Sequence, residues 1–481
     1  MVSCDKKQTF HECELNILRE AVDKIETSEG SKMVKNPDVQ RMISIVEDFL
    51  RNKELICYGG TAINNILPEH DQFYNKNVDL PDYDFFSKNA LDNAKELADI
   101  YVKAGYEEVE AKSGMHPGTF KVFVNFVPIA DITYLVDEIY DAIKKEAIEI
   151  NGIFYTPPDY LRMSMYLELS RPKGDVSRWE KVLKRLTLLN KYYPLEGHKC
   201  DNQTIQRSLS NKNIDGKLLF EKLRQILVNQ GVIFFGSMAV SVLTNTSGKK
   251  HQKINNIPDF DVLAIEPQRI ATVVKERLKY LGLRDVKIHH NTSIGEVISE
   301  HYELKINGET VLMIYKPLAC HSYNVVHYKN MDIKIATIDT MLSFYLAFLY
   351  SKRPYYNPDR IVCLATELFN IQRQNRLSQK GLLKRFTIDC YGKQETLDDI
   401  RGQKTQKFKE LKNKRGTREY EKYFLKYLPN EKKRTKRTTR TTRTRKVKHV
   451  RKQKKTKKNS KNVKHARTRR RSHKHKKRSK R

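Results

Sequence analysis

The sequence predicts an α/β protein made of two copies of one domain, followed by a helical segment and a basic tail. In residues 54–67 (ELICYGGTAINNIL) a short apolar run ends at a glycine pair, and apolar residues at helical spacing follow. This pattern is typical of a strand, a tight turn and a helix. Residues 232–243 (VIFFGSMAVSVL) repeat it, and an Asp-x-Asp pair begins 22 residues after the turn in both places. Repetition of a whole pattern indicates an internal duplication.

The repeat sets the expected domain boundaries. We expect residues 1–195 to form the first domain with its leading helices, and residues 196–429 to form the second domain with a helical segment. Residues 430–481 would form the tail. Apolar residues at helical spacing predict amphipathic helices over 10–27 and 38–53.

The glycine turn of the first copy is a candidate phosphate site. Gly59 and Gly60 would let a phosphate approach the backbone closely. The first free N–H groups of the helix that follows, together with its dipole, favour an anion. Gly59, Gly60 and Thr61 are therefore candidate nucleotide-binding residues.

Three aspartates are candidate metal ligands. Asp82 and Asp84 alternate in PDYDFF, so both carboxylates would project from one face of a strand. Close like charges repel unless a cation lies between them, and oxygen ligands beside a phosphate suit Mg²⁺. Asp131 interrupts a long β-like run over 120–135, where an unpaired buried charge would cost several kcal/mol, roughly. We expect its partner to be the same metal pair.

Either motif alone is weak, because glycine pairs and Asp-x-Asp are common in turns and loops. Together they resemble the nucleotidyltransferase superfamily of DNA polymerase β type, whose hallmark is hG[GS], then [DE]h[DE]h and a third acid. YGGTAINN, DYDFFS and LRMSMYLELSRP are also similar to the poly(A) polymerase catalytic subunit of large DNA viruses, the poxvirus and giant-virus type. The resemblance covers most of residues 40–425 and implies two tandem nucleotidyltransferase-like domains.

The resemblance implies template-independent addition of AMP from ATP to RNA 3′ ends, as in mRNA polyadenylation. Asp82, Asp84 and Asp131 would bind two Mg²⁺ or Mn²⁺ ions. One ion would activate the terminal hydroxyl for in-line attack on the α-phosphate, and the other would neutralise the departing pyrophosphate. Two alternatives stay open: another RNA nucleotidyltransferase (uridylyl- or CCA-adding), and a non-catalytic nucleic-acid-binding or packaging protein.

Two further features concern the nucleotide and the second copy. Lys121 follows a glycine-rich turn (SGMHPGT) that would either close over the triphosphate or form a hairpin. Matching VLMIYKP to IADITYL places Met313 where Asp131 stands, so the second copy lacks a third acid. We expect it to serve RNA grip or dimer contact, with Asp259 and Asp261 left for a weak cation.

The tail is compositionally distinct from the rest of the chain. From residue 432 to 481 there are 28 lysines and arginines and no acid, so this segment carries 28 of the 34 net positive charges. With so few apolar residues it should be disordered. Such a segment binds RNA or DNA by releasing counterions, and it also looks like a nuclear-import signal. We expect RNA and ATP as substrates and no membrane, with homodimer formation or a processivity subunit left open. The tail favours a chain that holds RNA by itself.

Cysteine usage and targeting signals indicate in which cellular compartment the protein is expected. No secretory leader and no spanning apolar run is evident, and seven cysteines occur without CxxC spacing. An odd, scattered set argues against a disulfide framework and against structural zinc. We therefore expect reduced thiols and a cytoplasmic protein of a viral factory, with virion packaging an alternative and the nucleus a lesser one.

Overall fold

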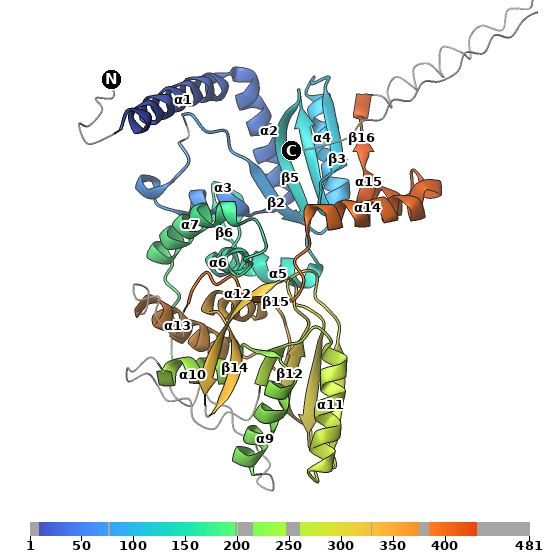
Figure 1. Ribbon diagram of the computed structural model, residues 1–481. Helices are drawn as coiled ribbons and strands as arrows, with labels where there is room; N and C mark the ends of the chain where they lie inside the picture. The colour runs from blue at the N-terminus through green and yellow to red at the C-terminus, as the bar shows by residue number, and fades with distance from the viewer. Residues whose placement is uncertain are drawn as a thin grey trace, which may run out of the picture. The chain divides into compact units, whose positions relative to one another are not determined.

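The structure of the chain is a computed structural model. It describes residues 9–75, 77–197, 200, 215–246, 260–328, 330–374 and 384–430. Two eight-stranded sheets and the helices around them make up this part of the chain (Figure 1). The predicted α/β class is confirmed.

The first sheet has the strand order β16-β3-β4-β5-β2-β1-β7-β6. Strand β2 pairs in parallel with β5, and β1 with β7, while the other neighbours are antiparallel. Its strands are β1 (Ile56–Cys57), β2 (Tyr83–Ser87), β3 (Val109–Ser113), β4 (Thr119–Val124), β5 (Val127–Tyr134), β6 (Ile148–Ile150), β7 (Ile153–Tyr155) and β16 (Lys426–Tyr427). The helices of this half are α1 (Phe10–Lys35), α2 (Pro37–Lys53), α3 (Gly59–Ile66), α4 (Ala90–Lys103), α5 (Asp137–Glu146), α6 (Pro158–Leu169) and α7 (Trp179–Tyr192), with 3-10 turns η1 (Glu69–Asp71) and η2 (Val176–Arg178).

The second sheet repeats this arrangement, with the order β10-β11-β12-β9-β8-β14-β13-β15. Its strands are β8 (Ile233–Phe234), β9 (Phe260–Leu263), β10 (Val286–Asn291), β11 (His301–Ile306), β12 (Glu309–Tyr315), β13 (His321–Tyr328), β14 (Met331–Ala336) and β15 (Cys390–Tyr391). Its helices are α9 (Gly216–Asn229), α10 (Ser237–Thr246), α11 (Pro267–Tyr280), α12 (Ile338–Phe348) and α13 (Pro358–Gln374). In sheet order, the seven strands β3-β4-β5-β2-β1-β7-β6 correspond one by one to β10-β11-β12-β9-β8-β14-β13. The duplication therefore extends to the topology of the sheet.

The region predicted as one long β-run over 120–135 is two strands. β4 and β5 form a hairpin whose turn residues, Asn125 and Phe126, have φ of 48° and 66°. Asparagine tolerates this left-handed conformation, which two-residue hairpin turns require. The apolar alternation on both sides hid the turn from the sequence pattern.

The two predicted N-terminal helices exist, but only one packs on the core. Helix α2 buries Val46 and Leu50, whereas α1 buries no residue and leaves Leu18 and Ile25 exposed. Helix α1 starts at Thr9, whose side chain forms a capping box with Glu12. Within the described residues, none of the helices combines the length and the hydropathy that crossing a membrane requires.

The helical C-terminal segment returns to the first sheet. It consists of α14 (Leu397–Leu411), the turn η4 (Lys412–Lys414), α15 (Arg418–Phe424) and β16. Strand β16 pairs with β3, and the Tyr427 hydroxyl donates to Asp99 over 2.8 Å (Figure 1, orange). Glu421 also forms an ion pair with Lys95 over 2.5 Å. The segment therefore closes an edge that β3 would otherwise expose.

The expectation of reduced thiols is wrong for several cysteines. Disulfides join Cys200 to Cys363 and Cys320 to Cys390, and Cys13 is also disulfide-bonded. Cys57 is a buried free thiol. The bonded pairs are 163 and 70 residues apart in the chain, so sequence spacing could not reveal them.

Helices α6 and α7 lie between the two halves of the chain. Arg162 links these two helices. Arg162 is 1% exposed; its Nε donates to Asn190 over 2.7 Å, and its guanidinium also contacts the Asp159 carboxylate and the Tyr193 carbonyl. Helix α6 also packs against α12, its counterpart in the second copy.

Replacing this arginine tests its structural role. Arg162→Met should lower the free energy of unfolding by about 3–5 kcal/mol, because it leaves a carboxylate and two amide groups without their partner. Urea denaturation measures the change. Lys184→Ala, which removes a surface pair with Glu180, should change it by less than about 0.5 kcal/mol. Equal effects of both substitutions would contradict this role.

Candidate active site

The glycine pair forms the predicted strand-to-helix turn. Strand β1 ends at Cys57, and α3 begins at Gly59. Gly59 has φ of +75°, and a Cβ there would lie 2.7 Å from a carboxylate oxygen of Asp84. A Cβ at Gly60 would lie 2.5 Å from the Tyr74 hydroxyl and 2.9 Å from the Arg185 guanidinium. Gly59 is required by its left-handed backbone and its close approach to Asp84, whereas a side chain at Gly60 would force Tyr74 and Arg185 to move.

The structure brings the three predicted acids together. Asp84 on β2 is paired in register with Asp131 on the parallel strand β5. Register partners on neighbouring strands point to the same face of a sheet. Asp82 directly precedes β2. On the other side of β5, Lys121 is the register partner of Asp131, and its ammonium contacts that carboxylate.

The acids repel one another. Burial, together with the charges of Asp82 and Asp131, raises the pKa of Asp84 to about 7, while Lys121 opposes the rise. Burial and the charge of Asp131 also raise the pKa of Asp82. A cation between the carboxylates would relieve this repulsion.

The carboxylates of Asp82, Asp84 and Asp131 have the chemistry that a divalent cation requires, but their side chains do not surround one point. In the described part of the chain, no three acidic, histidine or cysteine side chains already lie close enough to hold a metal. The partner expected for Asp131 was a metal pair, whereas the structure places the Lys121 ammonium there. Carboxylate oxygens are the ligands that Mg²⁺ prefers, and a cation would favour the ionised form of Asp84, whose pKa burial and the neighbouring acids raise. A divalent ion would compete with Lys121 for Asp131.

Two predicted nucleotide-binding side chains have other contacts. The buried Thr61 hydroxyl donates to the Asp82 carbonyl over 2.7 Å, so it holds the backbone of an acid. The glycine-rich turn before Lys121 is the hairpin between β3 and β4, closed by a 2.7 Å hydrogen bond from Gly114 N–H to the Thr119 carbonyl. Of the two alternatives for this turn, the structure has the hairpin.

Three basic residues near the acids were missed by the sequence reasoning. Arg178 opposes the raised pKa of Asp84, and Lys181 opposes that of Asp82. The charges of Arg185 and Arg178, with burial, lower the pKa of Lys181. Such a cluster favours an anion. The spacing of these residues, three and then four apart, places them on one helical face and is the signal that was overlooked.

Arg185 is fixed in place by two aromatic residues. Its guanidinium donates to the Tyr74 hydroxyl over 2.7 Å and lies 4.6 Å from the centre of the Phe73 ring. Both contacts leave it beside Gly60. A preorganised guanidinium next to a helix N-terminus is suited to phosphate oxygens.

The second copy keeps the turn but lacks the third acid. Phe235 N–H donates to the Asp261 carbonyl over 3.0 Å, as Tyr58 N–H does to Asp84 over 2.9 Å. The register partner of Asp261 is Met313, as the sequence alignment predicted. Asp259 lies outside the described residues.

The space beside Asp261 is nearly filled. The cavity there has a volume of about 20 Å³ and is lined by Asp261, Met313, Tyr315, Tyr345, Phe348, Tyr355, Tyr356, Asn357, Arg360 and Ile361. Tyr315 and Tyr356 hydroxyls share a 2.8 Å hydrogen bond across it. A nucleotide needs several hundred Å³, roughly, so this copy has no room for one as it stands.

The fold is nucleotidyltransferase-like, and comparisons with known proteins show which family the chain resembles. Residues 44–175 match the family model described as poly(A) polymerase catalytic subunit. The crystal structure of the Megavirus polyadenylate synthase superposes with a TM-score of 0.73 at 18% identity, covering 93% of this chain and 92% of that one. The predicted fold is therefore confirmed over both halves.

Two curated relatives are named "Putative poly(A) polymerase catalytic subunit". That of Acanthamoeba polyphaga mimivirus is 33% identical over 159 residues, which cover 32% of this chain and 27% of the relative. That of African swine fever virus is 33% identical over 164 residues, covering 33% and 34%. The matched segment spans about a quarter to a third of the relatives' length. Over that segment, which contains all three acids of the first copy, the resemblance read from the sequence is confirmed.

The raised pKa of Asp84 makes the metal-free protein sensitive to pH. Between about pH 4 and 7 the folded protein holds a proton that the unfolded chain has released, so stability falls as pH rises through this window. Asp84→Asn should therefore raise the free energy of unfolding at pH 8 by a few kcal/mol at most, since one pKa unit is about 1.4 kcal/mol. At pH 4 the variant should match the wild type.

Urea denaturation in EDTA across this range measures the effect. Asp48→Asn, at an exposed acid of α2, is the control and should show no such pH-dependent gain. A wild type whose stability is flat from pH 4 to 8 would contradict the electrostatic description.

Proposed function

We propose that the chain is a template-independent polynucleotide adenylyltransferase that adds AMP from ATP to RNA 3′ ends. The observation that carries this proposal is the register pairing of Asp84 with Asp131 beside the Gly59 turn. Three carboxylates next to a phosphate-binding turn serve phosphoryl chemistry, whereas a packaging protein would gain only repulsion from nucleic acid. The family match and the relatives' names support adenylate addition to RNA over other nucleotidyl transfer.

The chain's own groups would bind and orient the triphosphate. The first turn of α3 has no side-chain cap, so its N–H groups would be able to bind the β and γ phosphates. Arg185 and Lys181 supply positive charge on the facing helix, α7. Gly59 and Gly60 let the phosphates approach the backbone, and Thr61 fixes Asp82 from behind.

Asp82, Asp84 and Asp131 would hold two Mg²⁺ or Mn²⁺ ions. When bound, these ions supply charge neutralisation at the phosphates and lower the pKa of the RNA 3′ hydroxyl. Asp84 must be ionised to act as a ligand, and its raised pKa makes metal affinity increase with pH up to about 7. The Lys121 ammonium contacts Asp131, and a divalent ion held by this carboxylate would compete with the lysine for it.

The second copy and the tail would hold RNA. Loss of an acid at Met313 and the aromatic filling around Asp261 support a non-catalytic role for residues 196–429. The 28 positive charges after residue 431 support retention of RNA by the chain itself. The relatives' name, catalytic subunit, supports a partner subunit, and gel filtration of the full chain with RNA distinguishes a monomer, a homodimer and a need for a partner. The relatives' viral sources support a cytoplasmic viral factory as the place of action.

Extension of a labelled RNA with each of the four nucleoside triphosphates and Mg²⁺ tests the function. ATP should be incorporated far more efficiently than the other three. Asp84→Ala should lower kcat by at least about 10³-fold, because a carboxylate that would hold the catalytic ions is lost.

Asp261→Asn is the matched control in the second copy and should retain nearly full activity. Equal loss in both variants would show that chemistry does not belong to the first copy alone. Preferential use of UTP, or of CTP with ATP, would favour the uridylyl- or CCA-adding alternatives.

A further inference from the structure

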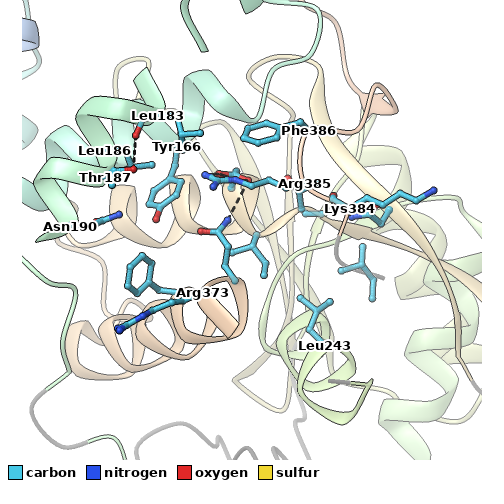
Figure 2. A pocket seen from close by; sticks show the side chains of 18 of the residues that line it. Tyr166, Leu183, Leu186, Thr187, Asn190, Leu243, Arg373, Lys384, Arg385 and Phe386 are labelled. Carbon is cyan, nitrogen blue, oxygen red and sulfur yellow. Dashed lines mark hydrogen bonds and ion pairs between the residues drawn. The ribbon is translucent and has the colours of Figure 1, made fainter. Parts of the chain in front are cut away.

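A large cavity lies between the two halves of the chain. It has a volume of about 590 Å³, in the range of sites for nucleotide-sized ligands. Its walls come from α6 and α7 on one side and from β14, α12 and α13 on the other. Figure 2 shows Tyr166 and Asn190 on one wall, with Arg385 and Phe386 across from them.

This cavity is separate from the acid site, because α7 stands between them. Lys181 and Arg185 are on the face of α7 that influences the acids. Leu183, Thr187 and Asn190 line the cavity. At about 100° per residue, Asn190 lies about half a turn around the helix from Lys181. A ligand in the cavity would not touch the glycine turn.

One wall offers hydrogen-bond donors. Tyr166 is fully buried, and its hydroxyl makes no hydrogen bond of normal geometry. Burial raises its pKa to about 12, and the nearby Asn190 amide opposes that rise only weakly. Because the Asn190 carbonyl oxygen accepts from Arg162 over 2.7 Å, the amide is oriented with its NH₂ group as the remaining donor. An unsatisfied buried hydroxyl costs about 1–3 kcal/mol, which a ligand could recover.

The opposite wall offers an acceptor. Arg385 binds both carboxylate oxygens of Asp339, at 2.6 Å and 2.9 Å, and fixes that side chain. Asp339 in turn accepts from the Gln372 amide nitrogen over 3.4 Å. The Gln372 carbonyl oxygen is thereby left as an acceptor. Two donors and one acceptor suit adenine, whose N6 amino group donates while N1 and N7 accept, whereas guanine presents two donors beside its O6 carbonyl and would need two acceptors.

Charge and ring contacts favour an anionic ligand with a flat apolar part. Four cationic side chains and one carboxylate line the cavity. Among the described residues, the exposed Arg373 and Lys384 have no ion-pair partner. Phe386 has φ of +61°, rare for a bulky residue, and its ring packs 5.4 Å from Trp179. Backbone strain of this kind is often found where a ligand is held.

We propose that this cavity is a second nucleotide site, which binds an adenosine 5′-phosphate group away from the acids. The group comes either from a free nucleotide or from an adenylate of bound RNA. The base lies between Tyr166, Asn190 and Gln372, and the phosphate is directed toward Arg373 and Lys384. Both halves contribute walls, so a ligand in this cavity contacts both α7 and the second copy. Helix α7 also carries Lys181 and Arg185, the cations proposed to face the triphosphate.

Calorimetric titration of the full chain with AMP in EDTA tests the proposal, because no metal-dependent triphosphate binding occurs there. AMP should bind, and GMP should bind about tenfold more weakly. Tyr166→Phe should weaken AMP binding about 5- to 10-fold, the value of one hydrogen bond of about 1 kcal/mol or slightly more. Thr187→Trp, at an exposed position of the lining, should abolish binding by filling the space.

Two controls separate this site from the rest of the molecule. Tyr350→Phe, at a buried tyrosine outside the cavity, and Lys181→Ala, near the acids, should leave AMP affinity unchanged. An adenylate trimer as competitor separates the two sources: displacement of AMP indicates an RNA adenylate, and no displacement indicates a free nucleotide. The proposal is overturned if AMP does not bind, if Tyr166→Phe and Thr187→Trp bind it as the wild type does, or if Lys181→Ala abolishes binding.

Discussion

Repulsion among carboxylates on one face of the first sheet is the constraint around which this site is built. Asp84 and Asp131 are held in register by β2 and β5, so the backbone hydrogen bonds of the sheet oppose their separation. In the metal-free protein the Lys121 ammonium and a raised pKa of Asp84 limit the cost. Both responses are reversible, because a divalent cation would displace the lysine from Asp131 and the proton from Asp84. A site that is stable but under-neutralised is ready for divalent ions.

The duplicated half shows what the fold requires when this constraint is absent. The same backbone hydrogen bond joins the turn to the strand in both copies, at Tyr58 and at Phe235. Gly236 also keeps the close approach to Asp261, where a Cβ would lie 2.2 Å from the carboxylate. With Met313 in place of an acid, the face no longer needs a cation, and tyrosines fill the space. Glycine at this turn is therefore a requirement of the fold in both copies, whereas the third acid is present only in the copy proposed to be catalytic.

Local patterns predicted much of this structure. The glycine turn and the Asp-x-Asp pair lie within about thirty positions of each other, where the periods of helix and strand apply. Asp131 and the duplication were found because each repeats or interrupts a local pattern further along the chain. The hairpin at Asn125 was missed because alternation continues through it. The disulfides of Cys200 and Cys320 were missed because their partners are brought near only by tertiary folding.

The basic residues of α7 show the same limit at the site itself. Arg185 is more than a hundred positions from Tyr74, yet the two side chains share a hydrogen bond beside Gly60. From sequence, Lys181 and Arg185 are typical of a solvated helical face. Their proximity to the acids depends on the orientation of α7, which the turn between α6 and α7 sets. The local sequence pattern does not specify that orientation. The contact of Lys121 with Asp131 was also not predicted, because the register of β4 against β5 brings the two residues together.

The central claim is that only the first copy binds the metal ions that chemistry needs. Crystals of the full chain grown with Mn²⁺ and a non-hydrolysable ATP analogue test it most directly, by anomalous scattering at the manganese edge. The account predicts manganese bound by Asp82, Asp84 and Asp131, the Lys121 ammonium moved away from Asp131, and no manganese at Asp261. Manganese at Asp261, or first-copy acids without metal at saturating Mn²⁺, would contradict it.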